Sequence, residues 1–354
     1  MDIVIRILFF VAGLLIVYAT VTAAIKTFVL PRSANVFLTR LVFRNMRRLF
    51  GLRLRKATTY EERDRVMALF APISLLTLPI VWLFNVLVGY MGMFWATGVE
   101  PLYEAFKLSG SSLLTLGFAS VNTLPQMLLA FTEATLGLIL IAVLIAYLPT
   151  MYSAFSQREA AVSMLEVRAG SPPSALTMIE RFYRLHNLSK LHEVWLDWER
   201  WFTFVGETHT SLAAINFFRS PQPDRSWITA AGAVLDAASL AASTLDIPRD
   251  IQADLCIRAG YLALRDICDF FRIPYNADPK PDDPISISRQ EFDEVYDRLK
   301  EQDIPVKADC EQAWRDFAGW RVNYDEPLLA LAELLMAPYA PWSSDRGLPR
   351  IAGL

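Results

Sequence analysis

The residues with the most distinctive chemistry form one short string, Thr115-Leu116-Gly117-Phe118-Ala119. A cation that gives up its hydration shell needs other oxygen ligands, and consecutive backbone carbonyls with a threonine hydroxyl supply them. Gly117 allows the positive φ that lets neighbouring carbonyls point in one direction, and the ring of Phe118 is expected to pack outward against a preceding helix. An ion-binding segment at Thr115 to Ala119 is one interpretation, and a plain turn between two hydrophobic helices is the other; the elements that flank the string favour the first.

Three apolar stretches in the chain are typical of a membrane protein. Its 354 residues are 54% hydrophobic, and the mean hydropathy of +0.30 is too high for an ordinary soluble protein of this size. The excess lies at about residues 3–30, 66–95 and 128–155, and each stretch is at least as long as the roughly 20 residues that a helix needs to cross a bilayer. The predicted fold is all-α, with three transmembrane helices.

The stretch immediately before the string, residues 102–114, predicts a short apolar helix. It has about half the length needed to cross a bilayer. Irregular backbone at membrane depth must face protein or water, so a short helix beside two spans suits a re-entrant element held among other helices. The filter-like loop at 115–120 is expected to leave the end of this helix.

The order of these elements resembles the pore domain of the potassium-channel superfamily: a span, a short pore helix, Thr-Leu-Gly-Phe, an external turn and a second span. The family's selectivity filter reads Thr-Val-Gly-Tyr-Gly-Asp, and residues 115–118 are similar to its first four positions. The resemblance covers about residues 66–155. It implies a homotetramer whose four loops form one selectivity filter for monovalent cations, K+ above all, without an organic cofactor. It also implies gating roles for Gly137, as a hinge, and for Pro149, near an inner bend; a glycine in a membrane helix equally permits close packing of helices.

Two residues depart from the family's filter. Ala119 stands where the family has its second glycine, and a left-handed backbone there would cost an alanine about 1 kcal/mol or more. Ser120 replaces the aspartate that follows, which removes a charge and a hydrogen-bond anchor. Discrimination between K+ and Na+ depends on the number and field strength of the carbonyl ligands. We expect a weaker preference for K+ than is typical of the family.

The distribution of charge predicts the topology. Residues 32–65, between the first two spans, are strongly basic, whereas the loop between the second and third spans carries only Glu100, Glu104 and Lys107. Because basic loops stay in the cytosol, the amino terminus is expected outside the plasma (inner) membrane and everything after Phe155 inside. The basic loop is expected to lie along the inner leaflet, partly as an amphipathic helix, and to attract anionic lipid headgroups. Its basic residues are Arg32, Arg40, Arg44, Arg47, Arg48, Arg53, Arg55, Lys56, Arg63 and Arg65.

The first stretch has a second interpretation as a secretory signal peptide, since Thr22-Ala23-Ala24 places small residues near its end. However, its head carries Asp2 beside Arg6 instead of a clear basic cluster, and the apolar run is long for a signal. These features favour a retained membrane helix.

The chain is expected to divide into a membrane domain at residues 1–157, a linker at 158–175, a helical cytosolic domain at 176–336 and a loosely packed tail at 337–354. Paired prolines at Pro172-Pro173 forbid a continuing helix in the linker. Beyond it, apolar residues recur at helical spacing and no alternating strand pattern occurs. The predicted helices are Leu176–His186, Lys190–Phe204, Trp227–Leu245, Ile251–Phe271, Arg289–Glu301 and Cys310–Arg321.

The cytosolic domain is acidic. Residues 1–157 hold 13 Lys/Arg and 7 Asp/Glu, so with a net charge of −3 for the whole chain the remainder carries −9. This balance argues against a nucleic-acid partner, and no other cytosolic partner is identified by the sequence.

Other candidate sites are weaker. The three histidines lack the spacing of metal ligands, the three cysteines are typical of reduced structural thiols, and Asp278, Asp282 and Asp283 favour a solvated acidic turn over a calcium site. No residues form a nucleophile, base and orienting group, so we do not expect an enzyme. The alternative to a channel is a non-conducting, membrane-anchored helical scaffold with a pore-like fold.

Overall fold

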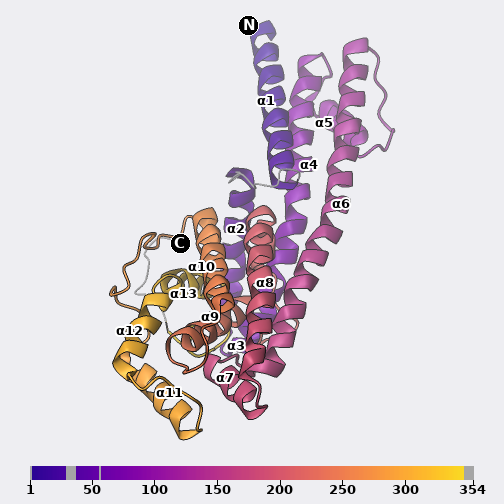
Figure 1. Ribbon diagram of the computed structural model, residues 1–354. Coiled ribbons are helices and arrows are strands. Elements are labelled where there is room, and N and C mark those ends of the chain that lie inside the picture. The colour runs from indigo at the N-terminus through magenta and orange to yellow at the C-terminus, as the bar shows by residue number, and fades with distance from the viewer. Residues whose placement is uncertain (1, 29–36, 56, 347–354) are drawn as a thin grey trace. The chain divides into compact units, whose positions relative to one another are not determined.

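The computed structural model describes residues 2–28, 37–55 and 57–346 and is almost entirely helical (Figure 1). Over these ranges there is no β-strand, which confirms the all-α prediction; one isolated bridge pairs Leu245 with Val306. The chain forms two compact units, one made of Met1–Ala57 and Val66–Ser153 and the other of Thr58–Arg65 and Ala154–Leu354. Residues 29–36 and 56, in the first predicted span and the basic loop, and 347–354 of the tail lie outside the described residues.

The first unit is built on three long apolar helices, α1 (Asp2–Phe28), α4 (Phe70–Ala96) and α6 (Leu124–Ala169). By length and composition, three helical stretches are able to cross a membrane: Ile3–Phe28, Tyr60–Ala96 and Leu124–Ala169. The prediction of three spans is therefore confirmed at this level. The second stretch begins in the short helix α3 (Tyr60–Ala68), which precedes α4. Between α1 and α3 lies α2 (Phe37–Leu54).

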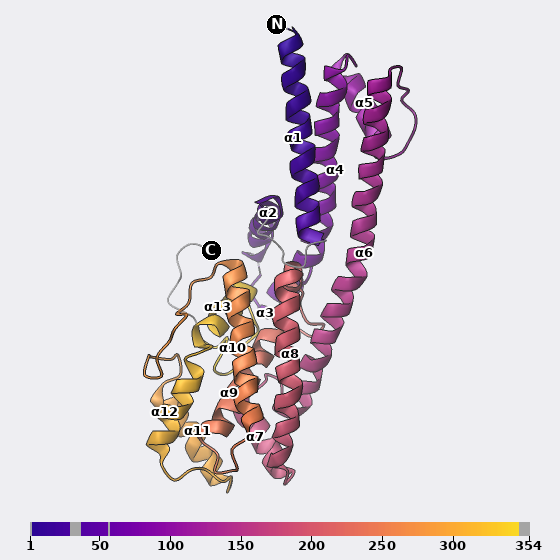
Figure 2. The ribbon, with the colours of Figure 1, turned by 45° about the horizontal axis from the view of Figure 1, so that its top comes forward.

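Helices α1 and α4 lie side by side (Figure 2) because small residues let their backbones approach. A Cβ atom added to Gly13 would lie 2.3 Å from the carbonyl oxygen of Gly89. At the start of α1, Arg6 forms an ion pair with Glu100, in the segment that follows α4. The start of α1 and the end of α4 therefore lie at the same end of the first unit.

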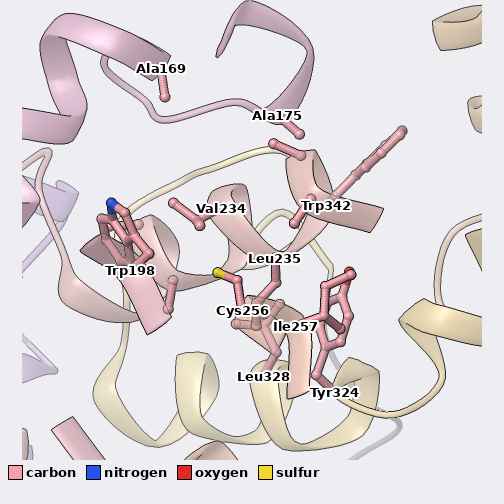
Figure 3. Packing of buried hydrophobic residues seen from close by; sticks show 14 of the residues in the cluster. Ala169, Ala175, Trp198, Val234, Leu235, Cys256, Ile257, Tyr324, Leu328 and Trp342 are labelled. Atoms are coloured by element: carbon pink, nitrogen blue, oxygen red, sulfur yellow. The ribbon is translucent and has the colours of Figure 1, made fainter. Parts of the chain in front are cut away.

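The second unit packs its helices around one apolar core, part of which is shown in Figure 3. Alanine-rich α9 (Trp227–Ser243) is buried along nearly its whole length. Trp195, Trp198, Trp201 and Phe202 of α8 (Leu191–Ser211) belong to the same core, as their helical spacing predicts. The helices of this unit after α6 are α7 (Ala175–Arg184), α8 (Leu191–Ser211), α9 (Trp227–Ser243), α10 (Ile251–Phe271), α11 (Arg289–Glu301), α12 (Cys310–Arg321) and α13 (Asp325–Leu335), with the 3-10 turns η1 (Leu188–Lys190) and η2 (Ala213–Phe217).

The predicted linker at 158–175 differs from the structure. Helix α6 continues to Ala169, and Val162, Leu165 and Ala169 are buried in the core of the second unit. These apolar residues recur every three or four positions, so they bury one helix face even though polar residues separate them. Only the residues from Gly170 onward, where φ is +85°, leave the helix.

The predicted loose tail at 337–354 also differs, because its described part is packed. The guanidinium of Arg321 is fully buried and donates to the backbone oxygen of Trp342 at 2.6 Å, to Asp325 at 2.7 Å and to Asp236. A buried cation needs such partners, and one of them is supplied by the tail. Helix α13, just before the tail, was not predicted.

Residues 213–219 contact two other segments of the second unit. One is α3, which leads into α4, and the other is the part of α6 that belongs to this unit. Arg158 on α6 is fully buried and donates to the carbonyl oxygens of Ile215 and Phe218, each at 2.8 Å. Arg219 pairs with Asp64 of α3 at 3.3 Å and donates to the carbonyl oxygen of Met336 at 3.0 Å. Arg158 and Arg219 therefore hold the second-unit part of α6 and the helix α3 against residues 213–219.

His209 lies against this contact and is fully buried. Its Nε2 is 3.4 Å from a guanidinium nitrogen of Arg158, which can only donate, so the ring proton lies on Nδ1, 3.2 Å from the Thr208 hydroxyl. Burial, together with the charge of Arg158, holds the pKa of His209 well below 6.5. The imidazole is therefore neutral in the folded protein at neutral pH.

This neutral histidine predicts a pH-dependent stability. Below about pH 6.5 the unfolded chain binds a proton that the folded chain does not, so the unfolding free energy falls as pH falls, by up to about 1.4 kcal/mol per pH unit. His209→Gln removes this contribution. Thermal unfolding of the second unit between pH 7.5 and 5 should show a smaller loss in the variant than in the native chain, and equal losses would contradict the account.

Candidate ion-binding segment

Helix α5 (Leu102–Leu113) positions the segment predicted to bind ions, and it begins near the position predicted for the short helix. It lies along one end of α4 (Figure 1), and Ala105, Leu108 and Leu113 are buried in the core of the first unit. Helix α5 is too short to cross a bilayer.

A hydroxyl and a carboxyl join α5 to both neighbouring helices. The Ser109 oxygen lies 3.0 Å from the carbonyl oxygen of Leu87 on α4 and 2.5 Å from the Glu133 carboxyl on α6. A hydroxyl has one hydrogen, so both bonds form together when Glu133 is a neutral acid that donates to Ser109. Glu133 is fully buried, and within the described residues its second carboxyl oxygen has no partner.

A second contact fixes the far end of α5. A Cβ atom added to Gly137 would lie 2.4 Å from the carbonyl oxygen of Leu113, so only glycine lets α6 approach this closely. Helix α6 continues without interruption through Gly137 and Pro149. The structure thus gives Gly137 a packing role, and gating roles for Gly137 and Pro149 stay predictions.

Helix α5 ends in a Schellman turn, with a threonine where glycine is usual. Leu116 N–H donates to the Ser111 carbonyl at 2.8 Å and Thr115 N–H to the Ser112 carbonyl at 3.0 Å. Thr115 has φ +54°, a conformation in which a β-branched residue is a true outlier and costs about 1–3 kcal/mol. Such a cost at a non-glycine residue is a feature that often marks functional sites.

The backbone oxygens of this segment are not used by the fold. In the described part of the chain, no carbonyl oxygen from Thr115 to Phe118 accepts a hydrogen bond. The sign of φ alternates, being positive at Thr115 and Gly117 but not at Leu116 or Phe118. Four oxygens are thus available as ligands.

The side chains of the segment do not lie as predicted. Phe118 is 61% exposed and Leu116 60%, so the Phe118 ring is not packed against α5. The chain is instead held just beyond, where Ala119 N–H donates to the Ser111 hydroxyl at 3.2 Å and Ala119 and Val121 pack on the core. The φ of Ala119 is not positive, so the strain expected for an alanine at this position does not arise.

The anchoring residues were the part that sequence reasoning missed. Glu133 is a carboxyl inside an apolar stretch, which is a signal of function, but its place near the end of that stretch is equally typical of a helix-start charge. Ser109 carried no signal, because serine is common in helices of every kind. Their pairing depends on the approach of two helices, which a single sequence does not specify.

Metal-binding clusters and known relatives offer no further guide. Across 2–28, 37–55 and 57–346, no three His, Cys, Asp or Glu side chains are grouped to hold a metal ion. Comparisons of the chain with protein-family models, curated proteins and solved structures each find no match.

The packing at Gly137 predicts contrasting effects of two alanine substitutions in the first unit. Gly137→Ala places a methyl group against the Leu113 carbonyl and should lower the unfolding free energy by about 1–3 kcal/mol. Gly51→Ala, in α2, meets no atom within 4 Å and should raise it by about 0.5–1 kcal/mol. Thermal unfolding in detergent compares the two, and equal effects would show that α5 and α6 do not approach at Gly137.

Proposed function

We propose that the chain is the pore-forming subunit of a homotetrameric cation channel that conducts K+ or similar monovalent ions. The observation that carries the proposal is the segment after α5, where four consecutive carbonyl oxygens accept no hydrogen bond from the described chain. A dehydrated cation is the natural partner for unused carbonyl oxygens at the end of a short helix held between two long apolar helices.

The ions would be coordinated by the carbonyls of Thr115 to Phe118 and by the Thr115 hydroxyl. One chain supplies a quarter of each ring of ligands, so four chains around an axis are needed. Such an axis would also bring further neighbours to Leu116 and Phe118, which are exposed in the single chain. The strain at Thr115 would be the cost of placing its carbonyl and hydroxyl in the ring.

Helix α6 has the surface that such an assembly needs. Its residues buried in the first unit include Gln126, Glu133, Leu140 and Tyr147, which recur every seven positions and form one narrow stripe. The rest of its apolar surface is exposed, including Phe131, Leu138, Ile145 and Tyr152. This surface is available for neighbouring chains and for lipid.

We also propose that the second unit lies in the cytosol and assembles or regulates the pore. The support for this proposal is that residues 213–219 contact two helices. One is α3, which leads into α4, and the other is the second-unit part of α6. A shift of this stretch would act on both helices that flank α5. Arg158→Met would remove the contact with α6, and Arg219→Met would remove the contact with α3, so each variant tests one connection.

A non-conducting helical scaffold is the alternative function. One observation favours it: the Schellman turn accounts for the conformation of Thr115 without any ion. Reconstitution separates the two functions, because a scaffold would give folded particles without ion flux.

Gly117→Val tests whether the segment conducts. A β-branched residue would be strained at the φ of +71° that Gly117 adopts, although no atom lies within 4 Å of the position where its Cβ would stand. Gly98→Val is the matched control, because Gly98 has φ +95° but lies outside the segment. We expect K+ flux into liposomes from the native protein, at least tenfold less from Gly117→Val and near-native flux from Gly98→Val. Equal flux from both variants would remove the segment from the pathway.

The departures at Ala119 and Ser120 predict weak selectivity. With fewer well-placed oxygens at the outer end of the segment, the preference for K+ over Na+ should be smaller than in channels with Gly-Tyr-Gly-Asp. The double change Ala119→Gly with Ser120→Asp should increase that preference. Reversal potentials with K+ on one side and Na+ on the other measure it, and strong K+ selectivity of the native protein would contradict this prediction.

A further inference from the structure

Helix α2 is the most basic element of the first unit. Its 18 residues contain five arginines and no acidic residue, and Arg55 follows directly after it. Chain length keeps it close to the membrane helices, because only eight residues separate its first residue, Phe37, from the end of α1 at Phe28. Eight residues span at most about 29 Å.

One face of α2 is built into the protein. Val42 is buried, and the rings of Phe43 and Phe50 meet the ring of Phe70 at the start of α4 at 6.1 and 5.6 Å between centroids. Leu38 and Met46 pack against the same core. This face fixes the orientation of α2, so the opposite face is a defined surface.

The opposite face carries Arg44, Arg48 and Arg55, whose spacings of four and seven residues place them on one side of a helix. All three are exposed, and in the described chain none has a carboxylate within 4.0 Å. Arginines without protein partners are free to form paired hydrogen bonds with phosphate oxygens.

Two large apolar side chains lie on or beside the same face. Phe37, seven residues before Arg44, is 73% exposed, and Leu52, four residues after Arg48, is 59% exposed. Exposed leucine and phenylalanine next to arginines are unfavourable in water but suit the boundary between lipid headgroups and acyl chains. A nucleic acid or a free phosphate would use the arginines and leave these apolar groups in water.

We propose that this face of α2 binds the headgroups of anionic phospholipids, with Arg44, Arg48 and Arg55 on the phosphate and Leu52 and Phe37 at the acyl chains. The proposal does not depend on ion conduction, because it rests on a helix outside α5 and the segment that follows it. Each arginine near an anionic surface contributes about fivefold in affinity, so three contribute about a hundredfold.

The test uses the purified full chain in detergent with short-chain phosphatidylglycerol and, for comparison, phosphatidylcholine of the same chain length. Isothermal titration should show phosphatidylglycerol binding that weakens with salt and falls about a hundredfold in Arg44→Gln/Arg48→Gln/Arg55→Gln. The control Arg184→Gln/Arg258→Gln/Arg272→Gln removes three exposed arginines of the second unit and should bind like the native protein. Equal loss in both triple variants would overturn the proposal.

Two further arms separate the lipid from other anions and guard against misfolding. Leu52→Ser should weaken phosphatidylglycerol binding while all arginines remain. Arg44→Lys/Arg48→Lys/Arg55→Lys, which keeps the charge but not the paired hydrogen bonds, should bind more weakly than the native chain and more tightly than the glutamine variant. If inorganic phosphate or a short oligonucleotide competes as well as the lipid does, or if the leucine variant binds unchanged, the site is a general anion site and the proposal is wrong.

Discussion

The arrangement of the first unit depends on the contact of Ser109 with the Leu87 carbonyl and the Glu133 carboxyl. Three helices meet at this hydroxyl, and two of them are the long apolar helices that flank α5. Polar groups in apolar surroundings hold their partners firmly because no water replaces a lost bond. Together with the close approach at Gly137, this contact determines where α5 ends and so where residues 115–118 begin.

The second unit uses buried guanidinium groups for the corresponding task. Arg158 and Arg321 are both fully buried. Each donates hydrogen bonds to backbone carbonyls as well as to carboxylates. A buried cation is destabilising unless every donor finds a partner, so these contacts specify one arrangement of the surrounding segments. Arg158 lies on the helix that also supplies Glu133, so a single helix carries the anchors of both units.

The elements that the sequence could predict are those with a strong periodic or compositional signal. The three apolar stretches, α5 and most helices of the second unit follow from length, hydropathy and helical spacing. The continuation of α6 to Ala169 could not be predicted, because polar residues such as Gln157 and Arg158 follow the apolar stretch. Arg158 is buried because carbonyl groups distant in sequence accept its hydrogen bonds and so offset the cost of burying its charge. The packed tail could not be predicted either, since its anchor, Arg321, lies 21 residues before Trp342, on the far side of α13.

The local geometry of the candidate segment could not be predicted from the sequence. Residue types, the flanking apolar stretches and the resemblance indicated Thr115 to Ala119, yet the Schellman turn at Thr115, the exposed Phe118 ring and the unstrained Ala119 depend on how Ser111 satisfies the backbone around it. These are local hydrogen-bond choices that compete within about 1–2 kcal/mol, too small a difference to read from composition.

The central claim is that the carbonyl oxygens of Thr115 to Phe118 from four chains surround a cation path. An electron cryo-microscopy map of the full-length protein purified in K+ tests it most directly. We expect four-fold particles in which these oxygens face the axis, with ion density between successive rings. Particles of one or two chains, or four-fold particles whose residues 115–118 face away from the axis, would contradict it.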